Sequence, residues 1–135
     1  MIDTQIPFEG LAIGGKRVTS ADGKTAAAYD PATGEVIAQV AQATAADVDH
    51  AVKTAHAVYS DGAWKQIRTR ERGQILQRIA NLIREKAEML AQIESRNGGK
   101  PISAARGEIG AVANTFEYYA GAVNKIHGQT IAPNV

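Results

Sequence analysis

Cysteine is absent from this sequence of 135 residues. The chain therefore has no disulfide, no thiolate ligand for a metal and no cysteine nucleophile. Aromatic residues make up only 5% of it, and no apolar run approaches the roughly 20 residues that a membrane-spanning helix requires. Any mechanism that needs a thiolate must take that group from outside these 135 residues.

The sequence also has no excess of positive or negative charge. The 15 basic and 14 acidic residues leave a formal net charge of +1 at pH 7, which gives no field that would select nucleic acid or an anionic membrane. The first five residues lack the basic start and apolar block of a secretory signal. We therefore expect one cytoplasmic domain with a modest core and with neither nucleic-acid nor membrane partners.

Tight turns divide the first part of the chain into short strands. Gly14 and Gly15 predict the turn of a β-hairpin. In a later turn, Pro31 fixes one dihedral angle and Gly34 supplies the corner. We expect an antiparallel β-region within residues 1–43, with strands at 11–13, 16–19, 25–29 and 35–40.

Apolar residues recur at three- and four-residue spacing from Thr44 onward, which predicts three helices within residues 44–128. Thr44 and Asp47 have the spacing of a capping box. The inner face of the first helix is expected to be Val48, Ala51, Val52, Ala55, Val58 and Tyr59. The long helix, 69–97, carries the stripe Ile75, Leu76, Ile79, Leu82, Ile83, Ala87, Leu90 and Ile93. The third helix, after Pro101, carries Ile102, Ala105, Ile109, Val112, Phe116, Tyr119, Ala120, Val123 and Ile126.

Several details of these helices are also predicted. The hydroxyl of Thr69 is expected to cap the first free amides of the long helix. Three glycines inside the third helix are unfavourable for helix formation, so close backbone approach is expected at Gly107, Gly110 and Gly121. Residues 129–135 resemble the start of a strand.

No complete active site can be assembled from the residue pattern. The run from Gly10 to Lys16 resembles a phosphate-binding loop, but Arg17 replaces the hydroxyl residue and a strand follows instead of a helix. The glycine fingerprint of a dinucleotide site is missing, and the three histidines lack metal-ligand spacing. Basic residues that open the long helix are interpreted as solvated charge: Arg68, Arg70 and Arg72.

A series of short motifs nevertheless occurs in a fixed order: Ile13–Lys16, Asp30–Val40, Asp47–Val52, Arg70–Leu76, Asn97–Pro101, Phe116–Gly121 and Lys125–Gly128. Together they resemble the N-terminal portion of the NAD(P)-dependent aldehyde dehydrogenases, and the resemblance covers residues 8–133. It implies an α/β parent protein. This chain would contribute a short antiparallel β-region (1–43), three α-helices of the cofactor-binding domain (44–128) and the start of a truncated strand (129–135).

The family oxidises an aldehyde to a carboxylic acid with NAD or NADP, through a cysteine thiohemiacetal and thioester. In the family, the cysteine and the cofactor site lie C-terminal to the matched region. The resemblance therefore implies that this chain alone has no catalytic or cofactor-binding residue, is inactive and binds no NAD(P). Its expected partner is the remainder of the enzyme, in a parent homodimer or homotetramer.

Two peripheral roles follow from the same resemblance. Positions that line the substrate tunnel in the family align with Gly107, Glu108 and Ala111. A structural monovalent cation in many relatives is bound at positions that align with Ala28, Tyr29 and Asn97. Relatives usually have an acidic residue at the position of Asn97, whereas the side-chain amide of Asn97 offers an oxygen without charge.

Two hypotheses of different class remain open. The first is a segment of an aldehyde dehydrogenase whose apolar faces lie against a catalytic body. The second is a stand-alone helical binding or assembly module derived from that scaffold, which would bury the long apolar stripe against a partner.

Overall fold

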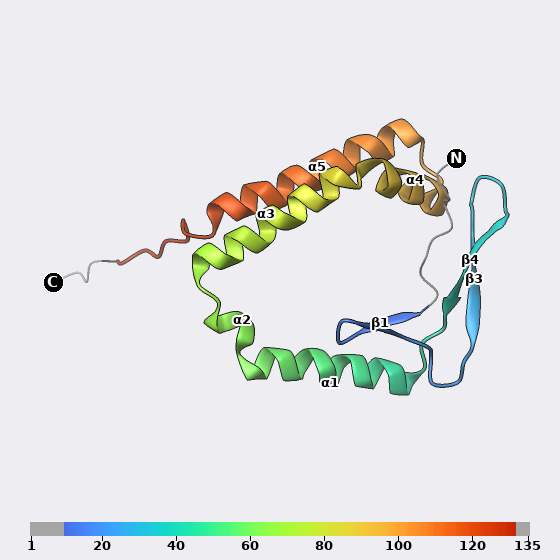
Figure 1. The fold of residues 1–135 in the computed structure, drawn as a ribbon, viewed down its shortest axis with the longest axis horizontal. Coiled ribbons are helices and arrows are strands. Elements are labelled where there is room, and N and C mark those ends of the chain that lie inside the picture. Colours follow the sequence, from blue (N-terminus) through green and yellow to red (C-terminus); the bar gives the residue numbers. More distant parts are fainter. Residues whose placement is uncertain (1–9, 132–135) are drawn as a thin grey trace.

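The structure is a computed structural model, and it describes residues 10–131. The strands come first: β1 (Leu11–Ile13), β2 (Lys16–Val18), β3 (Thr25–Tyr29) and β4 (Val36–Ala41). The helices follow: α1 (Ala45–Asp61), α2 (Ala63–Gln66), α3 (Thr69–Glu85), α4 (Ala87–Gly98) and α5 (Ile102–Ala122). The predicted order, a short antiparallel β-region followed by helices, is confirmed (Figure 1).

The strands form two separate antiparallel pairs, β1 with β2 and β3 with β4. Gly14 and Gly15 both adopt positive φ, of 59° and 75°, which matches the turn that the twist of a hairpin favours. In the second pair the register shifts between Ala28 and Tyr29. The predicted hairpin and the predicted turn at Pro31 are therefore both present, but they do not join in one sheet.

The start of α1 has the capping box that the sequence predicts. The amide of Asp47 donates to the Thr44 hydroxyl at 3.3 Å, and the amide of Thr44 donates to the Asp47 carboxylate at 2.8 Å. This arrangement satisfies two amides that the first helical turn leaves without partners. Gly62, with φ of 74°, ends the helix and begins the one-turn α2.

The predicted long helix is interrupted, and this prediction is wrong in two respects. Lys86 has non-helical dihedral angles and separates α3 from α4. The sequence has neither glycine nor proline at this position, and the apolar spacing continues across it. Nothing in the sequence therefore predicts the break. The bend allows both halves of the stripe to contact α5. At the other end, Arg68 is the N-cap residue of α3 and Thr69 is already helical.

Helices α3, α4 and α5 pack together through small residues (Figure 1). The buried positions on these helices include Ala80, Ala91, Ala105 and Ala113. A methyl group on Gly73 would lie 3.0 Å from the carbonyl oxygen of Ala120, so α3 and α5 approach closely at this glycine. No large side chain is wholly buried in the part of the chain that the structure describes.

Three predictions about α5 and the tail are corrected. A methyl group on Gly107, Gly110 or Gly121 would meet no described atom within 4 Å, so the expected close approach is absent within residues 10–131. The helix ends at Ala122, before the last apolar residues of its predicted stripe. Residues 129–131 form no strand, and residues 132–135 lie outside the described range.

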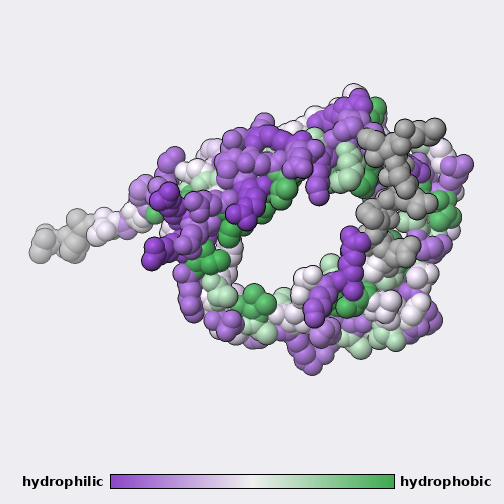
Figure 2. All heavy atoms as spheres, viewed as in Figure 1, coloured by the Kyte–Doolittle hydropathy of each residue, from purple (hydrophilic) through white to green (hydrophobic). Residues whose placement is uncertain are grey.

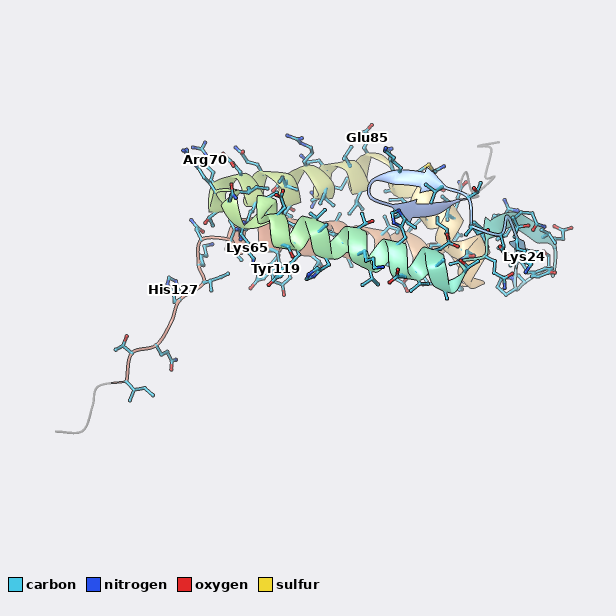
Figure 3. The ribbon with its side chains drawn as sticks, turned by 90° about the horizontal axis from the view of Figure 1, so that it is seen from below. Lys24, Lys65, Arg70, Glu85, Tyr119 and His127 are labelled. Carbon is cyan, nitrogen blue, oxygen red and sulfur yellow. The ribbon has the colours of Figure 1, made fainter. Side chains whose placement is uncertain are left out.

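The elements surround a central opening that passes through the molecule (Figure 2). Helix α1 lies across this opening from α3 and α5 (Figure 1). Glu85 points away from the rest of the chain, and His127 lies on the C-terminal segment that leaves the helices (Figure 3). None of the helices described within residues 10–131 has the length and apolar character needed to cross a membrane.

Candidate functional site

The predicted cation ligands come from two segments that the fold brings together. A methyl group on Gly99, two residues after Asn97, would lie 2.6 Å from the Cγ of Pro31, two residues after Tyr29. The turn after β3 therefore packs against the end of α4. The register shift between Ala28 and Tyr29 interrupts the regular strand pairing at the two residues whose carbonyl groups are the candidate ligands.

This turn is held by its own hydrogen bonds. The Asp30 carboxylate accepts from the amide of Ala32 at 2.8 Å, and the Asp30 carbonyl accepts from the amide of Gly34 at 2.7 Å. The candidate cation ligands, the carbonyl groups of Ala28 and Tyr29 and the side-chain amide of Asn97, would all bind through neutral oxygens. Neutral oxygens suit a hard monovalent ion but add no negative charge to the site. Among residues 10–131 no group of three or more His, Asp or Glu side chains could hold a metal ion.

The connection from α4 to α5 carries an ion cluster. The Lys100 ammonium contacts the carboxylate of Glu94 at 2.7 Å and that of Glu108 at 2.5 Å. Hydrogen bonds to Glu108 and then to Glu94 raise the pKa of Lys100 above its ordinary value. The Ser95 hydroxyl donates to the Lys100 carbonyl at 2.7 Å. Lys100 therefore fixes the turn between the helices and neutralises Glu108.

The predicted tunnel residues share one exposed face of α5. Gly107 and Ala111 are four positions apart, and Glu108 lies between them with its carboxylate on Lys100. No described atom would touch a methyl group on Gly107. The structure therefore presents an exposed small-residue surface beside one paired acid.

Two further ion pairs connect α5 to the other helices. Arg106 on α5 donates to both carboxylate oxygens of Glu88 on α4, at 2.8 and 2.9 Å. These bonds lower the pKa of Glu88 to about 2. Arg84 on α3 contacts Glu117 at 2.5 Å and donates to the Asn114 side chain at 3.0 Å. Sequence spacing within a helix cannot reveal such pairs, because they form between helices.

The interpretation of Arg72 as solvated charge is wrong. Its guanidinium donates to the carbonyl oxygens of Trp64 and Lys65 at 3.0 Å and to that of Ile67 at 3.2 Å. It also lies 5.5 Å from the centre of the Trp64 ring. Arg72 thus binds the end of α2 and the following turn to α3. The sequence gives no signal for this role, because Arg68 and Arg70 lie even closer to Trp64 along the chain.

An open groove of about 650 Å³ lies between α3 and α5. Its lining is mixed: polar side chains (Arg70, Gln74, Gln77, Glu117 and Asn124) alternate with small or apolar residues (Gly73, Ala120, Gly121 and Val123). It contains no cysteine or histidine with a neighbouring base, so it offers no nucleophile for covalent catalysis.

The described residues do not fit a dinucleotide cofactor. Sites of that kind lie at the carboxyl edge of a parallel sheet, usually with a glycine-rich turn before a helix. Within residues 10–131 both strand pairs are antiparallel, and the sequence lacks that glycine pattern. The two strand pairs and the helical layer of residues 10–131 are the kind of arrangement expected for one part of a larger α/β protein.

Comparison with known proteins identifies the family. The aldehyde dehydrogenase family profile matches residues 18–134, and the chain belongs to that family. It is 43% identical over 128 residues to aldehyde dehydrogenase family 2 member B4, mitochondrial, of Arabidopsis thaliana, covering 94% of this chain and 24% of that protein. It is 39% identical over 129 residues to human retinal dehydrogenase 2, covering 94% and 25%. The chain thus spans about a quarter of the length of these relatives, and it matches their N-terminal part.

Solved structures give the same result. An aldehyde dehydrogenase from Bacillus cereus superposes with a TM-score of 0.87 at 38% identity, covering 96% of this chain and 27% of that one. A betaine aldehyde dehydrogenase from Staphylococcus aureus, crystallised with NAD+, superposes with a TM-score of 0.90 at 28% identity, covering 98% and 27%. The open arrangement is therefore the shape of a fragment of the aldehyde dehydrogenase fold.

Proposed function

We propose that this chain is the N-terminal segment of an NAD(P)-dependent aldehyde dehydrogenase, which oxidises an aldehyde to a carboxylic acid. One observation carries the proposal: nearly the whole chain superposes on about a quarter of such an enzyme. The nicotinamide cofactor supplies the hydride acceptor in the family. The nucleophilic cysteine belongs to the remainder, because this chain has none, and the chain alone is inactive.

The segment's own residues shape the access path to the site. We assign the exposed face of α5 with Gly107, Glu108 and Ala111 to the wall of the substrate tunnel. The two small residues leave space there, and Lys100 holds the Glu108 carboxylate in place.

We assign a structural monovalent cation to the junction between the β3–β4 turn and the end of α4. Its ligands would be the carbonyl oxygens of Ala28 and Tyr29 and the side-chain oxygen of Asn97. The contact of Pro31 with Gly99 supports this assignment, because it places the two segments side by side. With neutral ligands, the site would bind its cation more weakly than one that contains a carboxylate.

The partner of the segment is the remainder of the enzyme, and the complete protein forms a homodimer or homotetramer. We propose a cytoplasmic location, which fractionation of cells that produce the complete protein would test. The name of one relative includes the word mitochondrial, so recovery in mitochondria would contradict this part of the proposal.

The test joins this chain to the part of the Bacillus cereus enzyme that follows the matched segment. The fused protein should reduce NAD+ or NADP+ with an aldehyde, followed by the absorbance of the reduced nicotinamide. The isolated chain should show neither turnover nor micromolar binding of NAD(P). A fused protein that folds and binds cofactor but leaves aldehydes unchanged would refute the proposed function.

A stand-alone helical module is the second candidate, and one observation favours it. Helices α3, α4 and α5 bury alanines against one another without help from residues outside the chain. A compact monomer that unfolds cooperatively would support this candidate. Sedimentation and thermal unfolding of the isolated chain measure both properties.

A further inference from the structure

Lys100 is the most shielded member of the ion cluster between α4 and α5. Its side chain is 28% exposed, whereas those of Glu94 and Glu108 are 44% and 56% exposed. Its ammonium contacts the two carboxylates at 2.7 and 2.5 Å, and an ammonium group has enough donors to bind both at once. Isolated exposed ion pairs contribute little. Here the cation lies between two acids that come from different helices.

The backbone at Lys100 is also held in place. A methyl group on Gly99, which ends α4 with a φ of 69°, would lie 2.6 Å from the Cγ of Pro31. The carbonyl oxygen of Lys100 accepts a hydrogen bond from the Ser95 hydroxyl at 2.7 Å, and the ring of Pro101 fixes the next φ angle. Lys100 is therefore fixed at the position from which its side chain reaches both acids.

The two acids of the cluster lie on different sides of it. A methyl group on Gly98 would lie 3.7 Å from a carboxylate oxygen of Glu94, so this acid lies over the end of α4. Glu108 belongs to α5 and to the face that also carries Gly107 and Ala111. One ammonium and two carboxylates leave the cluster with a net charge of −1. Of the two carboxylates, only that of Glu108 belongs to the small-residue face.

A carboxylate without a partner on the wall of a tunnel would attract a positively charged substrate, and a bound ammonium group offsets this attraction. We propose that Lys100 is a positioning residue that sets the charge preference of the tunnel: by holding the Glu108 carboxylate, it makes this wall favour aldehydes without a positive charge. This inference rests on the proposed function, which assigns Glu108 to the tunnel wall. It adds the class of substrate that suits this wall, an uncharged aldehyde.

Two aldehydes of the same shape test this preference in the fused protein. Betaine aldehyde carries a trimethylammonium group, and 3,3-dimethylbutanal has a carbon atom in place of that nitrogen. The ratio of their kcat/KM values, cationic over neutral, isolates the effect of charge. Lys100→Gln should raise this ratio by at least about tenfold, through a lower KM for betaine aldehyde. Lys100→Arg keeps the positive charge beside Glu108 and should change the ratio by less than about threefold.

Arg106→Gln is the matched control, because it also removes one positive charge near the start of α5. Arg106 binds Glu88, and a separation of two residues places it on nearly the opposite side of the helix from Glu108. It should change the ratio by less than about twofold. The double variant Lys100→Gln with Glu108→Gln has the net charge of the unchanged cluster. It should restore the original ratio, because the attracting carboxylate is gone.

The outcomes separate this inference from the proposed function. An unchanged ratio in Lys100→Gln, or equal effects of Lys100→Gln and Arg106→Gln, would overturn the inference, while turnover of either aldehyde would still support the function. A fused protein that binds cofactor but oxidises neither aldehyde would refute the function.

A binding experiment then tests the charge preference without turnover. Choline and 3,3-dimethylbutan-1-ol are alcohols of the same two shapes, and calorimetry measures their affinities for the fused protein with cofactor bound. A rise of about tenfold in the affinity ratio on Lys100→Gln, absent in Arg106→Gln, would support the charge preference of this wall. An unchanged affinity ratio would overturn it.

Discussion

The carboxylate of Asp47 accepts hydrogen bonds from the backbone amide of Ala21, 26 residues earlier in the chain, at 3.1 and 3.2 Å. The same carboxylate caps α1 through the amide of Thr44. One side chain therefore attaches the turn after β2 to the start of a helix. Hydrogen bonds from Thr44 and then from Ala21 hold the pKa of Asp47 below its ordinary value of 3.8.

The first prediction follows from that pKa. Asp47→Asn should speed hydrogen exchange at the start of α1 and at the amide of Ala21. Because the folded pKa is lowered, the contribution of the carboxylate is complete above the unfolded value and disappears as the pH falls through the folded one. The difference between the two proteins should be constant down to about pH 5, shrink below 3.8 and vanish once the pH has fallen through the folded pKa. A difference that persists at lower pH would contradict this account.

The cap itself gives a second prediction. Thr44→Ala removes the hydroxyl that accepts from the Asp47 amide and should destabilise α1 by about 1 kcal/mol. Amide exchange within the first turn of α1 measures the change. Thr115→Ala is a suitable control: the Thr115 hydroxyl donates only to a carbonyl inside α5, so α1 should be unaffected. Equal exchange at the start of α1 in both variants would show that the hydroxyl does not cap the helix.

The third prediction concerns the pair that links α4 to α5. The pKa of Glu88 should be about 2, because Arg106 binds its carboxylate through two nitrogens. Carbon NMR of the side-chain carboxyl group during an acid titration measures this value. Arg106→Gln should return it toward the ordinary 4.5. The stabilisation by the pair is present above the unfolded pKa and disappears as the pH falls toward 2. An unchanged titration in the variant would show that the pair does not form in solution.

The fourth prediction uses the single tryptophan as a reporter. Arg72→Lys keeps the charge but loses the planar fork that binds three carbonyl oxygens. It should destabilise the turn between α2 and α3 by about 1–2 kcal/mol. Quenching of Trp64 fluorescence by acrylamide should increase, because the guanidinium no longer covers the ring. Arg70→Lys is the control, since Arg70 is exposed on the same helix and lines the groove between α3 and α5 rather than the Trp64 ring. Equal quenching in both variants would contradict the assigned contact.

Local features of the fold could be predicted from the sequence because they depend on neighbouring residues. The capping box at Thr44 is one example, and the hairpin turn at Gly14 and Gly15 is another. The break at Lys86 could not be predicted, since it depends on how two helices contact α5. The apolar periodicity alone continues through that residue.

In the candidate site, too, the sequence could predict some features and not others. Family motifs indicate positions such as Asn97 and Glu108, but no motif reveals that Lys100 binds the Glu108 carboxylate. The role of Arg72 was missed for a similar reason, because its partners are backbone carbonyl groups that every sequence contains. Side-chain partners across elements require the structure.

The last prediction compares two glycines on facing helices. Gly73→Ala should destabilise the chain by about 1–3 kcal/mol, because the methyl group would lie 3.0 Å from the Ala120 carbonyl oxygen and 3.1 Å from Val123. Gly110→Ala meets no described atom within 4 Å. It should therefore stabilise α5 in the isolated chain by up to about 1 kcal/mol, the difference in helix propensity between the two residues.

In the fused protein, Gly110→Ala should destabilise the fold instead of stabilising it. The face of α5 that carries Gly110 is open in this chain, and in the complete enzyme we expect the remainder to approach it closely. A methyl group there would then cost packing energy, while Gly73→Ala would destabilise both forms. Thermal unfolding of the isolated and fused proteins measures both substitutions. Stabilisation by Gly110→Ala in both forms would show that no backbone approaches this face, and the three glycines of α5 would then need another explanation.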